Sequence, residues 1–115
     1  MNTRQRGKMG EDIAVNYLKN KGYTIITTGF RSRFGEIDII AKNKEYLTFT
    51  EVKLRKNNNF AHAREHVGKV KQRKIIATAN IWLAGHKNEQ QPRFDVIEIY
   101  TDPQDIIHIE NAFGV

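Results

Sequence analysis

Two stretches of sequence decide the fold: residues 35–42 read Gly-Glu-Ile-Asp-Ile-Ile-Ala-Lys, and residues 46–55 read Tyr-Leu-Thr-Phe-Thr-Glu-Val-Lys-Leu-Arg. Both are rich in the β-branched and aromatic residues that are typical of strands. The short polar segment between them, residues 43–45, favours a tight turn. We therefore predict that the two stretches pair as a β-hairpin, and the rest of the chain can be arranged around it.

One face of the second strand changes character along its length. Because side chains alternate across a strand, this face carries two apolar residues and then two charged ones: Leu47, Phe49, Glu51 and Lys53. On the first strand, Asp38 and Ile40 behave in a similar way. Buried charges are costly unless they meet each other, a cation or water. The charged end of the hairpin is therefore a candidate site.

If Asp38 and Glu51 are neighbours across the hairpin, their negative charges repel and one of them tends to take up a proton. A divalent cation removes this conflict, because Mg²⁺ binds one or two carboxylates and keeps waters that a substrate phosphate can replace. Lys53 would then orient a nucleophilic water or offset charge on a phosphate oxygen. The pattern suits metal-assisted phosphodiester hydrolysis, but spacing alone favours a simpler alternative, a salt bridge between Lys53 and either carboxylate.

The remaining elements follow from hydrophobic periodicity and strand composition. Helices are expected over residues 4–21 and 63–84, and further strands over residues 23–28, 94–100 and 106–109. A glycine follows each helix and supplies a stop signal. The order αβββαβ, with a short last strand, predicts one α/β domain over the 115 residues, with a mixed sheet flanked by helices.

Composition excludes several classes of protein. With 39% hydrophobic and 28% charged residues, the chain is typical of globular rather than disordered proteins. It has no cysteine, which excludes a disulfide scaffold, a thiolate metal site and a cysteine nucleophile, and is compatible with the cytoplasm, where we expect the protein. The apolar runs are only a few residues long, so neither a membrane span nor a signal peptide is expected.

The net charge of +6 is distributed unevenly. Residues 1–34 hold seven basic and two acidic residues, residues 35–50 two and three, residues 51–74 eight and two, and residues 75–115 two and six. Two basic blocks therefore flank a short acidic stretch that contains Asp38. Clustered cations neutralise phosphates and release counterions, which favours nucleic acid as a partner. A high pI alone is also found in proteins with no such partner.

The pattern Gly35-Glu36-Ile37-Asp38 followed by Glu51-Val52-Lys53 resembles the core of the PD-(D/E)XK nucleases, the restriction-endonuclease-like and Holliday-junction-resolvase-like group. More closely, the chain resembles the YraN-like bacterial family of predicted endonucleases. The match runs from Gly10-Glu11 through the hairpin and Lys71-Gln72 to Arg93-Phe94-Asp95. The resemblance implies a restriction-endonuclease-like fold and a metal-dependent endonuclease that hydrolyses DNA or branched nucleic acid.

The resemblance also assigns roles to individual residues. Asp38 and Glu51 would be catalytic carboxylates that bind Mg²⁺ or Mn²⁺, and Lys53 would be the catalytic lysine. Glu11, on the first helix, matches an acidic residue that reaches the same metal in resolvases. Its alternative is a solvent-exposed carboxylate that the helix macrodipole favours. Glu36 shares the face of Asp38 and is either a further ligand or an exposed residue at the start of the strand.

Seven residues around the predicted site are candidates for binding nucleic acid: Arg31, Arg33, Arg55, Lys56, Lys71, Gln72 and Lys74. Lys71 and Lys74 are three residues apart and share a helix face, so they would extend a track for phosphates. Gln72 rests on the family pattern alone. For each cation taken singly, a solvated surface charge is the simpler expectation. Phe30 and Phe34 would either stack on unpaired bases or pack against the sheet.

DNA is thus the expected partner, and resolvase-like relatives imply a two-fold homodimer as an option. The alternative function is a non-catalytic nucleic-acid-binding or adaptor protein on the same fold, since a fold does not prove cleavage.

Histidines offer weaker candidates. His62 and His66, four residues apart, could place two zinc ligands on one helix face, but they lack a convincing third ligand. His86 and His108 are isolated and are expected to titrate at the surface. Trp82 is expected in the core, although a base-stacking platform is its alternative.

Overall fold

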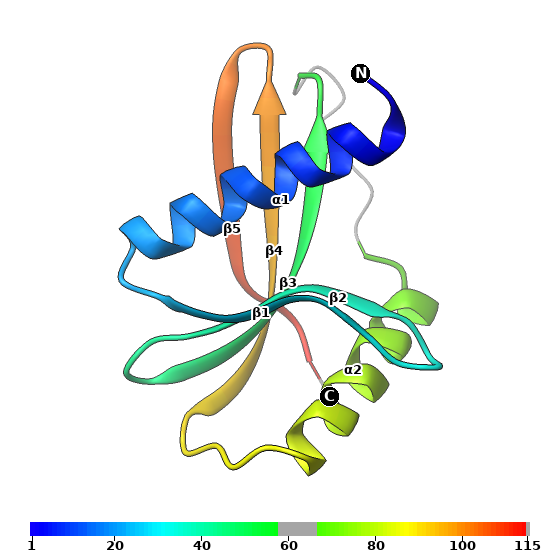
Figure 1. The fold of residues 1–115 in the computed structure, drawn as a ribbon, viewed down its shortest axis with the longest axis vertical. Helices are drawn as coiled ribbons and strands as arrows, with labels where there is room; N and C mark the ends of the chain where they lie inside the picture. The colour runs from blue at the N-terminus through cyan, green and yellow to red at the C-terminus, as the bar shows by residue number, and fades with distance from the viewer. Residues whose placement is uncertain (58–66, 115) are drawn as a thin grey trace.

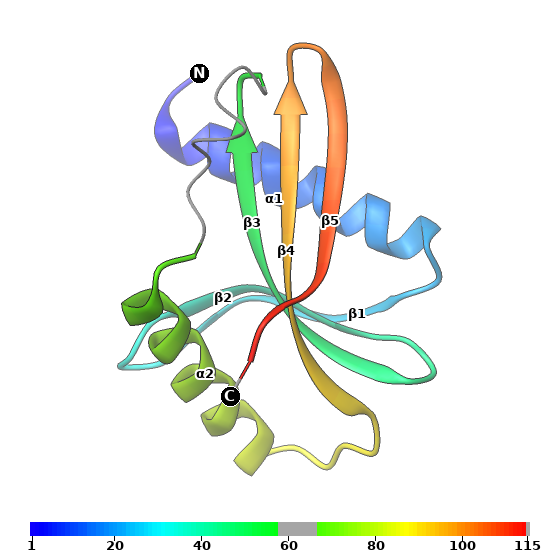
Figure 2. The same cartoon turned by 180° about the vertical axis from the view of Figure 1, so that it is seen from behind.

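A five-stranded mixed sheet with one helix on each face organises the residues that the computed structural model describes, 1–57 and 67–114 (Figures 1 and 2). In chain order the elements are α1 (Thr3–Asn20), β1 (Thr24–Arg31), β2 (Glu36–Lys42), β3 (Tyr46–Arg55), α2 (Lys69–Ala84), β4 (Gln91–Thr101) and β5 (Gln104–Phe113). This confirms the predicted α/β class and the order αβββαβ with a further strand, and it is compatible with a restriction-endonuclease-like core. Within the described residues, neither helix has the length and apolar character needed to cross a membrane.

The strand order across the sheet is β1-β2-β3-β4-β5, and among these strands only β3 and β4 run parallel. Antiparallel neighbours such as β2 and β3 can be joined by a short turn, whereas parallel neighbours need a longer crossover connection. The chain between Arg55 and Gln91 makes this crossover and contains α2. As a result, α2 packs on one face of the sheet and α1 on the other (Figure 2).

Each face of the sheet buries its own apolar cluster. The α2-side cluster includes Ile40, Phe49, Phe94, Ile75 and Trp82. The α1-side cluster includes Ala14, Leu18, Ile39, Ile97 and Ile99. The prediction that Trp82 lies in the core is confirmed, since its side chain is 5% exposed and its ring meets Phe49 edge-on at 6.1 Å.

Several boundaries differ from the predicted ones. Helix α2 begins at Lys69 rather than at residue 63, because Gly68 is extended (φ −66°, ψ 159°) and caps the helix. The predicted helical residues 63–66 lie outside the described residues, as does the candidate zinc pair His62 and His66. Strands β4 and β5 are longer than predicted, because backbone pairing with neighbouring strands carries both through polar residues that have little strand propensity.

Both edge strands of the sheet are irregular. In β1, the register shifts between Ile25 and Thr27, and Gly29 has a φ of 63°. In β5, Asn111 has a φ of 52°, close to a shift in the pairing of β5 with β4. Such bulges interrupt the regular row of N–H and C=O groups that an edge strand presents.

Strand β2 changes face where the candidate site residues begin. Ile40 packs in the α2-side cluster and its neighbour Ile39 in the α1-side cluster, as alternation requires. Ile37, however, also packs on the α2 side, so the alternation is broken at Asp38. Regular pairing with β3 ends at Ile39, opposite Thr50. Residues 36–38 of β2, which precede Ile39, bend away from β3 (Figure 1). We call the place where the two strands separate, next to Asp38 and Glu51, the fork.

A buried polar network links β4 to the elements around it. Arg93 donates from Nε and Nη2 to the two carboxylate oxygens of Asp95, at 2.9 and 2.8 Å, and from Nη2 to the Tyr23 hydroxyl at 2.6 Å. His108 Nε2 lies 2.8 Å from Asp95 Oδ2, and the Asn111 N–H donates to Oδ1 at 3.0 Å. Burial raises the pKa of Asp95, but these hydrogen bonds and the charge of Arg93 outweigh burial and lower the pKa.

The prediction that His108 lies at the surface is wrong, because its side chain is only 2% exposed. Its Nδ1 lies 3.3 Å from both Lys21 Nζ and the Tyr17 hydroxyl. A lysine ammonium can only donate, so Nδ1 accepts, and the proton on Nε2 is donated to Asp95. The His108 ring therefore links α1 to the centre of the sheet.

Replacing Asp95 with Asn is expected to lower the free energy of unfolding by about 3 kcal/mol at pH 7, because among the described residues buried Arg93 then keeps only the half-exposed Glu110 as a counter-charge. The pKa of Asp95 is lowered in the folded protein, so its stabilising contribution exists above the usual aspartate range and is lost as the pH falls below about 4. Urea unfolding of both proteins at pH 7 and pH 3 measures this difference.

Asp102→Asn, at an exposed position, is the matched control, and its stability should equal that of the wild type. An Asp95→Asn protein as stable as wild type at pH 7 would show that the network does not stabilise the fold.

Candidate functional site

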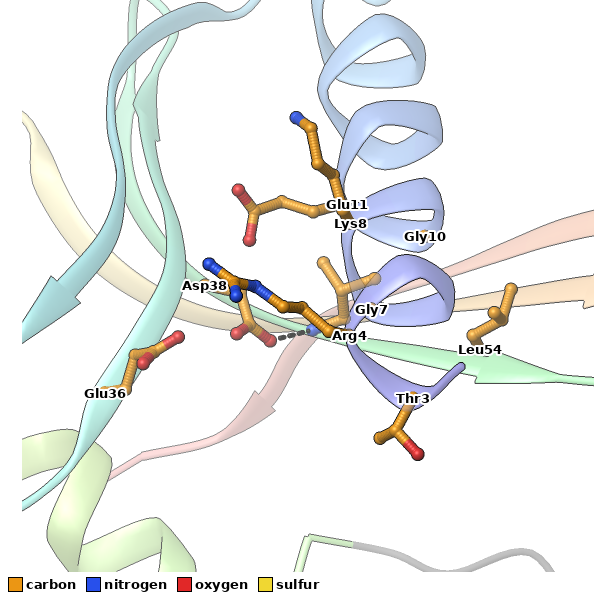
Figure 3. Close-up of a pocket in the computed structure, with 10 residues that line it drawn as sticks. Thr3, Arg4, Gly7, Lys8, Gly10, Glu11, Glu36, Asp38 and Leu54 are labelled. Carbon is orange, nitrogen blue, oxygen red and sulfur yellow. Dashed lines mark hydrogen bonds between the residues drawn. The ribbon is translucent and has the colours of Figure 1, made fainter. Parts of the chain in front are cut away.

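A cleft of about 380 Å³ lies between the first turns of α1 and the strands β2 and β3 (Figure 3). Three carboxylates line it, Glu11 from α1 and Glu36 and Asp38 from β2. Two cations of α1, Arg4 and Lys8, line the same cleft. The cleft therefore gathers charges of both signs beside the fork.

The structure brings Asp38 and Glu51 together at the fork. The last regular pair of β2 and β3 is Ile39 with Thr50, so the next residues along the two strands are Asp38 and Glu51. Glu51 lies close enough for its side chain to perturb the Asp38 carboxyl group. Asp38 Oδ2 accepts a hydrogen bond of 2.8 Å from the Val52 N–H, which fixes its carboxyl group against β3.

The two carboxyl groups cannot both ionise freely. Burial raises the pKa of Asp38 to about 7, and the charge of Glu51 adds to this rise. The Val52 N–H and the charge of Lys71 act in the opposite direction. Lys71 Nζ, from the first turn of α2, lies 3.2 Å from Glu51 Oε2. Near neutral pH the Asp38 carboxyl group therefore changes between its protonated and ionised forms.

Glu11 approaches the same pair from α1, and Figure 3 shows its side chain directed toward Asp38. Burial raises the pKa of Glu11, and the charge of Asp38 raises it further. The neighbouring Gly10 is buried, and a Cβ atom at this position would lie 3.4 Å from Leu54 Cβ. A Cβ atom there would make ordinary van der Waals contact with β3, so α1 lies against β3 at the position next to Glu11.

Glu36 lies at the rim of the cleft, where it forms an ion pair of 2.7 Å with Arg31. Among the described residues, no three carboxylates or histidines are gathered closely enough to form a ready-made metal site. The structure therefore presents a carboxylate pair, Asp38 and Glu51, with Glu11 nearby, rather than a closed ligand cage.

Lys53 follows Glu51 on the same face of β3 and is partly exposed. In the described part of the chain its side chain has neither an ion pair nor a hydrogen bond, so the predicted alternative of a salt bridge with Asp38 or Glu51 is wrong there. Its partner in the parallel pairing with β4 is Glu98, which is 1% exposed.

Sequence reasoning missed Glu98, a buried acid on the α2 face of the sheet. It lies 3.7 Å from Arg55 Nε and accepts a hydrogen bond of 3.3 Å from the Tyr100 hydroxyl. The available signal was a charged residue between Ile97 and Ile99, within a segment that is otherwise apolar or aromatic from Val96 to Tyr100. On β4, as on β3, the α2-side face thus changes from apolar to charged.

The residues predicted to bind nucleic acid fall into two groups. Lys71 and Lys74 lie near the fork, since Lys71 pairs with Glu51 and the Cβ of Lys74 lies beside Gly35 at the start of β2. Arg31 reaches the rim through Glu36.

The other candidates have partners within the fold or lie farther away. Arg55 turns inward to Glu98, and the Gln72 amide donates to the backbone oxygen of Val67 at 2.7 Å. Lys56 follows the far end of β3, where its backbone oxygen meets the turn between β4 and β5. Arg33 lies over the ring of Phe34, with 4.7 Å to the ring centroid.

The two aromatic residues predicted either to stack on bases or to pack against the sheet lie in different environments. Phe30 packs against the α2-side cluster, whereas Phe34 is 41% exposed.

Sequence comparisons place the chain among similar proteins. The model of the family described as "Uncharacterised protein family UPF0102" matches residues 10–99. A UPF0102 protein of Clostridioides difficile is 44% identical over 114 residues, covering 98% of this chain and 100% of the relative. Another from Caldanaerobacter subterraneus is 42% identical over 119 residues, with 98% of each chain covered, and one from Vibrio parahaemolyticus is 41% identical over 113 residues, with 96% of this chain and 93% of the relative covered. These matches confirm the resemblance to the YraN-like family.

Replacing Asp38 with Asn is expected to stabilise the metal-free protein at high pH by on the order of 2 kcal/mol. Because the pKa of Asp38 is raised to about 7, wild-type stability falls as the pH rises from the usual aspartate range near 4 toward 7. Asparagine keeps an oxygen that accepts the Val52 N–H but has no charge. Urea unfolding in chelator should show equal stabilities of wild type and Asp38→Asn at pH 4.5. At pH 8 the variant should be the more stable protein.

Asp12→Asn is the control, because Asp12 is exposed on the same helix as Glu11 and should show no such pH dependence. If Asp38→Asn and wild type had equal stabilities at pH 8, the ionised Asp38 carboxylate would not destabilise the folded protein.

Proposed function

Because the chain belongs to the UPF0102 family, whose description names no activity, we propose from its own site that it is a metal-dependent nuclease. It would hydrolyse phosphodiester bonds in nucleic acid, with DNA or branched DNA as the substrate. The support comes from the acid pair at the fork and from the cations around it.

One observation carries the proposal: Asp38 and Glu51 are held together where both cannot be ionised without cost. A divalent cation removes this cost. Mg²⁺ and Mn²⁺ prefer oxygen ligands, and Mg²⁺ is commonly bound by one or two carboxylates, with waters that a substrate phosphate can replace. The donor set at the fork, which consists of carboxylates beside an open cleft, fits such an ion.

The residues around the pair would have distinct roles. When bound, the ion would lower the pKa of a coordinated water and offset charge on a phosphate oxygen. Asp38 and Glu51 would hold it, with Glu11 approaching from α1. Lys53 would orient the attacking water or offset the charge that develops on the phosphate. A lysine with no partner in the described part of the chain is suited to that role.

Cleavage of labelled duplex, single-stranded and four-way-junction DNA tests the proposal. We expect at least one substrate to be cut with Mg²⁺ or Mn²⁺ and none in chelator. Glu51→Gln and Lys53→Met should each lower the cleavage rate by about a hundredfold or more, because they remove a metal ligand and the group that positions water. Glu89→Gln, an exposed acid away from the fork, should cut at the wild-type rate. The nuclease proposal is lost if no substrate is cut or if Glu51→Gln cuts as fast as wild type.

A non-catalytic nucleic-acid-binding protein on the same fold is the second candidate. The ion pair between Lys71 and Glu51 favours it, because a lysine already supplies positive charge to the acid pair. The lack of a ready-made three-ligand metal site among the described residues points the same way. This candidate predicts salt-dependent binding of DNA without cleavage under any metal condition, and equal binding by wild type and Lys53→Met.

A further inference from the structure

The first two turns of α1 carry cations that sequence reasoning did not assign. Arg4, Lys8 and Glu11 are spaced by four and three residues, so they project from one face of the helix. All three line the cleft that contains Asp38, and Figure 3 shows them on the side of α1 that faces it. Glu11 thus approaches the acid pair with two cations beside it.

The position of these cations is unfavourable for the helix alone. The N-terminus of a helix has a partial positive charge, so cations in the first turns destabilise it and carboxylates are preferred there. The first turn of α1 nevertheless contains no acidic residue. Capping does not require the cations either, because Asn2 and Gln5 form a reciprocal capping box with hydrogen bonds of 2.8 and 3.0 Å.

The described contacts leave both charges available. The Arg4 side chain forms no hydrogen bond or ion pair with any other described residue. Lys8 lies 3.4 Å from Asp12, but these side chains are 78% and 61% exposed, and exposed pairs of this kind contribute little to stability. Between them, Gly7 lines the same cleft, and a Cβ atom there would meet nothing within 4 Å. The helix face between Arg4 and Lys8 is therefore open to a ligand.

The opposite face of the sheet shows the same arrangement. The first turn of α2 also contains no acidic residue, and its Lys71 lies 3.2 Å from Glu51. In both views, the N-terminal ends of the two helices lie on the side of the molecule where β2 separates from β3 (Figures 1 and 2). Cations from two helices, one on each face of the sheet, therefore flank the acid pair.

We propose that Arg4 and Lys8 bind backbone phosphates of a nucleic-acid strand that passes the fork, so that the strand is held by α1 on one face of the sheet and by Lys71 of α2 on the other. The identity of this partner rests on the proposed function. The acids at the fork would repel a polyanion on their own, and cations on both sides offset that repulsion.

Binding of the full-length protein to labelled single-stranded and duplex DNA in chelator, at a series of KCl concentrations, tests the proposal. The double variant Arg4→Gln/Lys8→Gln is expected to bind roughly five- to twentyfold more weakly at low salt. It should also lower the slope of log affinity against log salt by about 1.4 to 1.8, since each of the two lost phosphate contacts removes about 0.7 to 0.9. Its stability to urea should not fall, because the removed charges lie near the positive end of the helix.

Lys42→Gln/Lys44→Gln is the matched control, since it removes two exposed positive charges at the turn between β2 and β3. It should reduce binding and the salt slope much less. Equal effects of the two double variants, an unchanged slope in Arg4→Gln/Lys8→Gln, or absence of salt-dependent binding by wild type would overturn the proposal. Because chelator prevents turnover, this result is independent of whether Glu51→Gln abolishes cleavage, so a failure of the nuclease proposal is recognised separately.

Discussion

The geometry of the fork depends on one hydrogen bond, from the Val52 N–H to the Asp38 carboxyl at 2.8 Å. A buried backbone N–H needs an acceptor, and in a regular antiparallel pair the neighbouring strand supplies a carbonyl oxygen. Here residues 36–38 of β2, which precede Ile39, are not paired with β3. The Asp38 side chain accepts the hydrogen bond in place of a backbone carbonyl oxygen. The same contact fills a gap in the sheet and fixes a carboxyl group next to Glu51, so strand separation and site formation have a single cause.

The two central strands support the site through a shared change of polarity. On the α2 face, Phe49 is followed by Glu51 along β3, and Val96 is followed by Glu98 along the parallel strand β4. Helix α2 packs on the apolar halves of both strands. Glu51 and Glu98 lie on the same two paired strands, directly beyond the apolar halves, so the packing of the core fixes their backbone positions. A site on such strands is held more firmly than one on loops.

Much of this could be predicted from the sequence, because alternation within a hairpin brings residues such as Asp38 and Glu51 together through local pairing alone. The errors arise where contacts depend on elements distant in the chain. In sequence His108 is isolated, and it is buried only because β5 places it next to Asp95 and α1 places Tyr17 against it. In sequence Arg55 has no visible partner, and its ion pair with Glu98 arises only because β4 pairs in parallel with β3. Residue spacing shows which side chains share a face, but not which element will cover that face.

The irregular edges of the sheet have a consequence for self-association. A regular edge strand offers its unpaired backbone groups to a second copy, which can then extend the sheet. In β1 the shift near Ile25 and the left-handed Gly29 disturb this row of groups, and in β5 the left-handed Asn111 does the same. Continuous sheet formation between two copies is therefore disfavoured at both ends. A two-fold assembly through helix surfaces would leave the pairing of the five strands as it is.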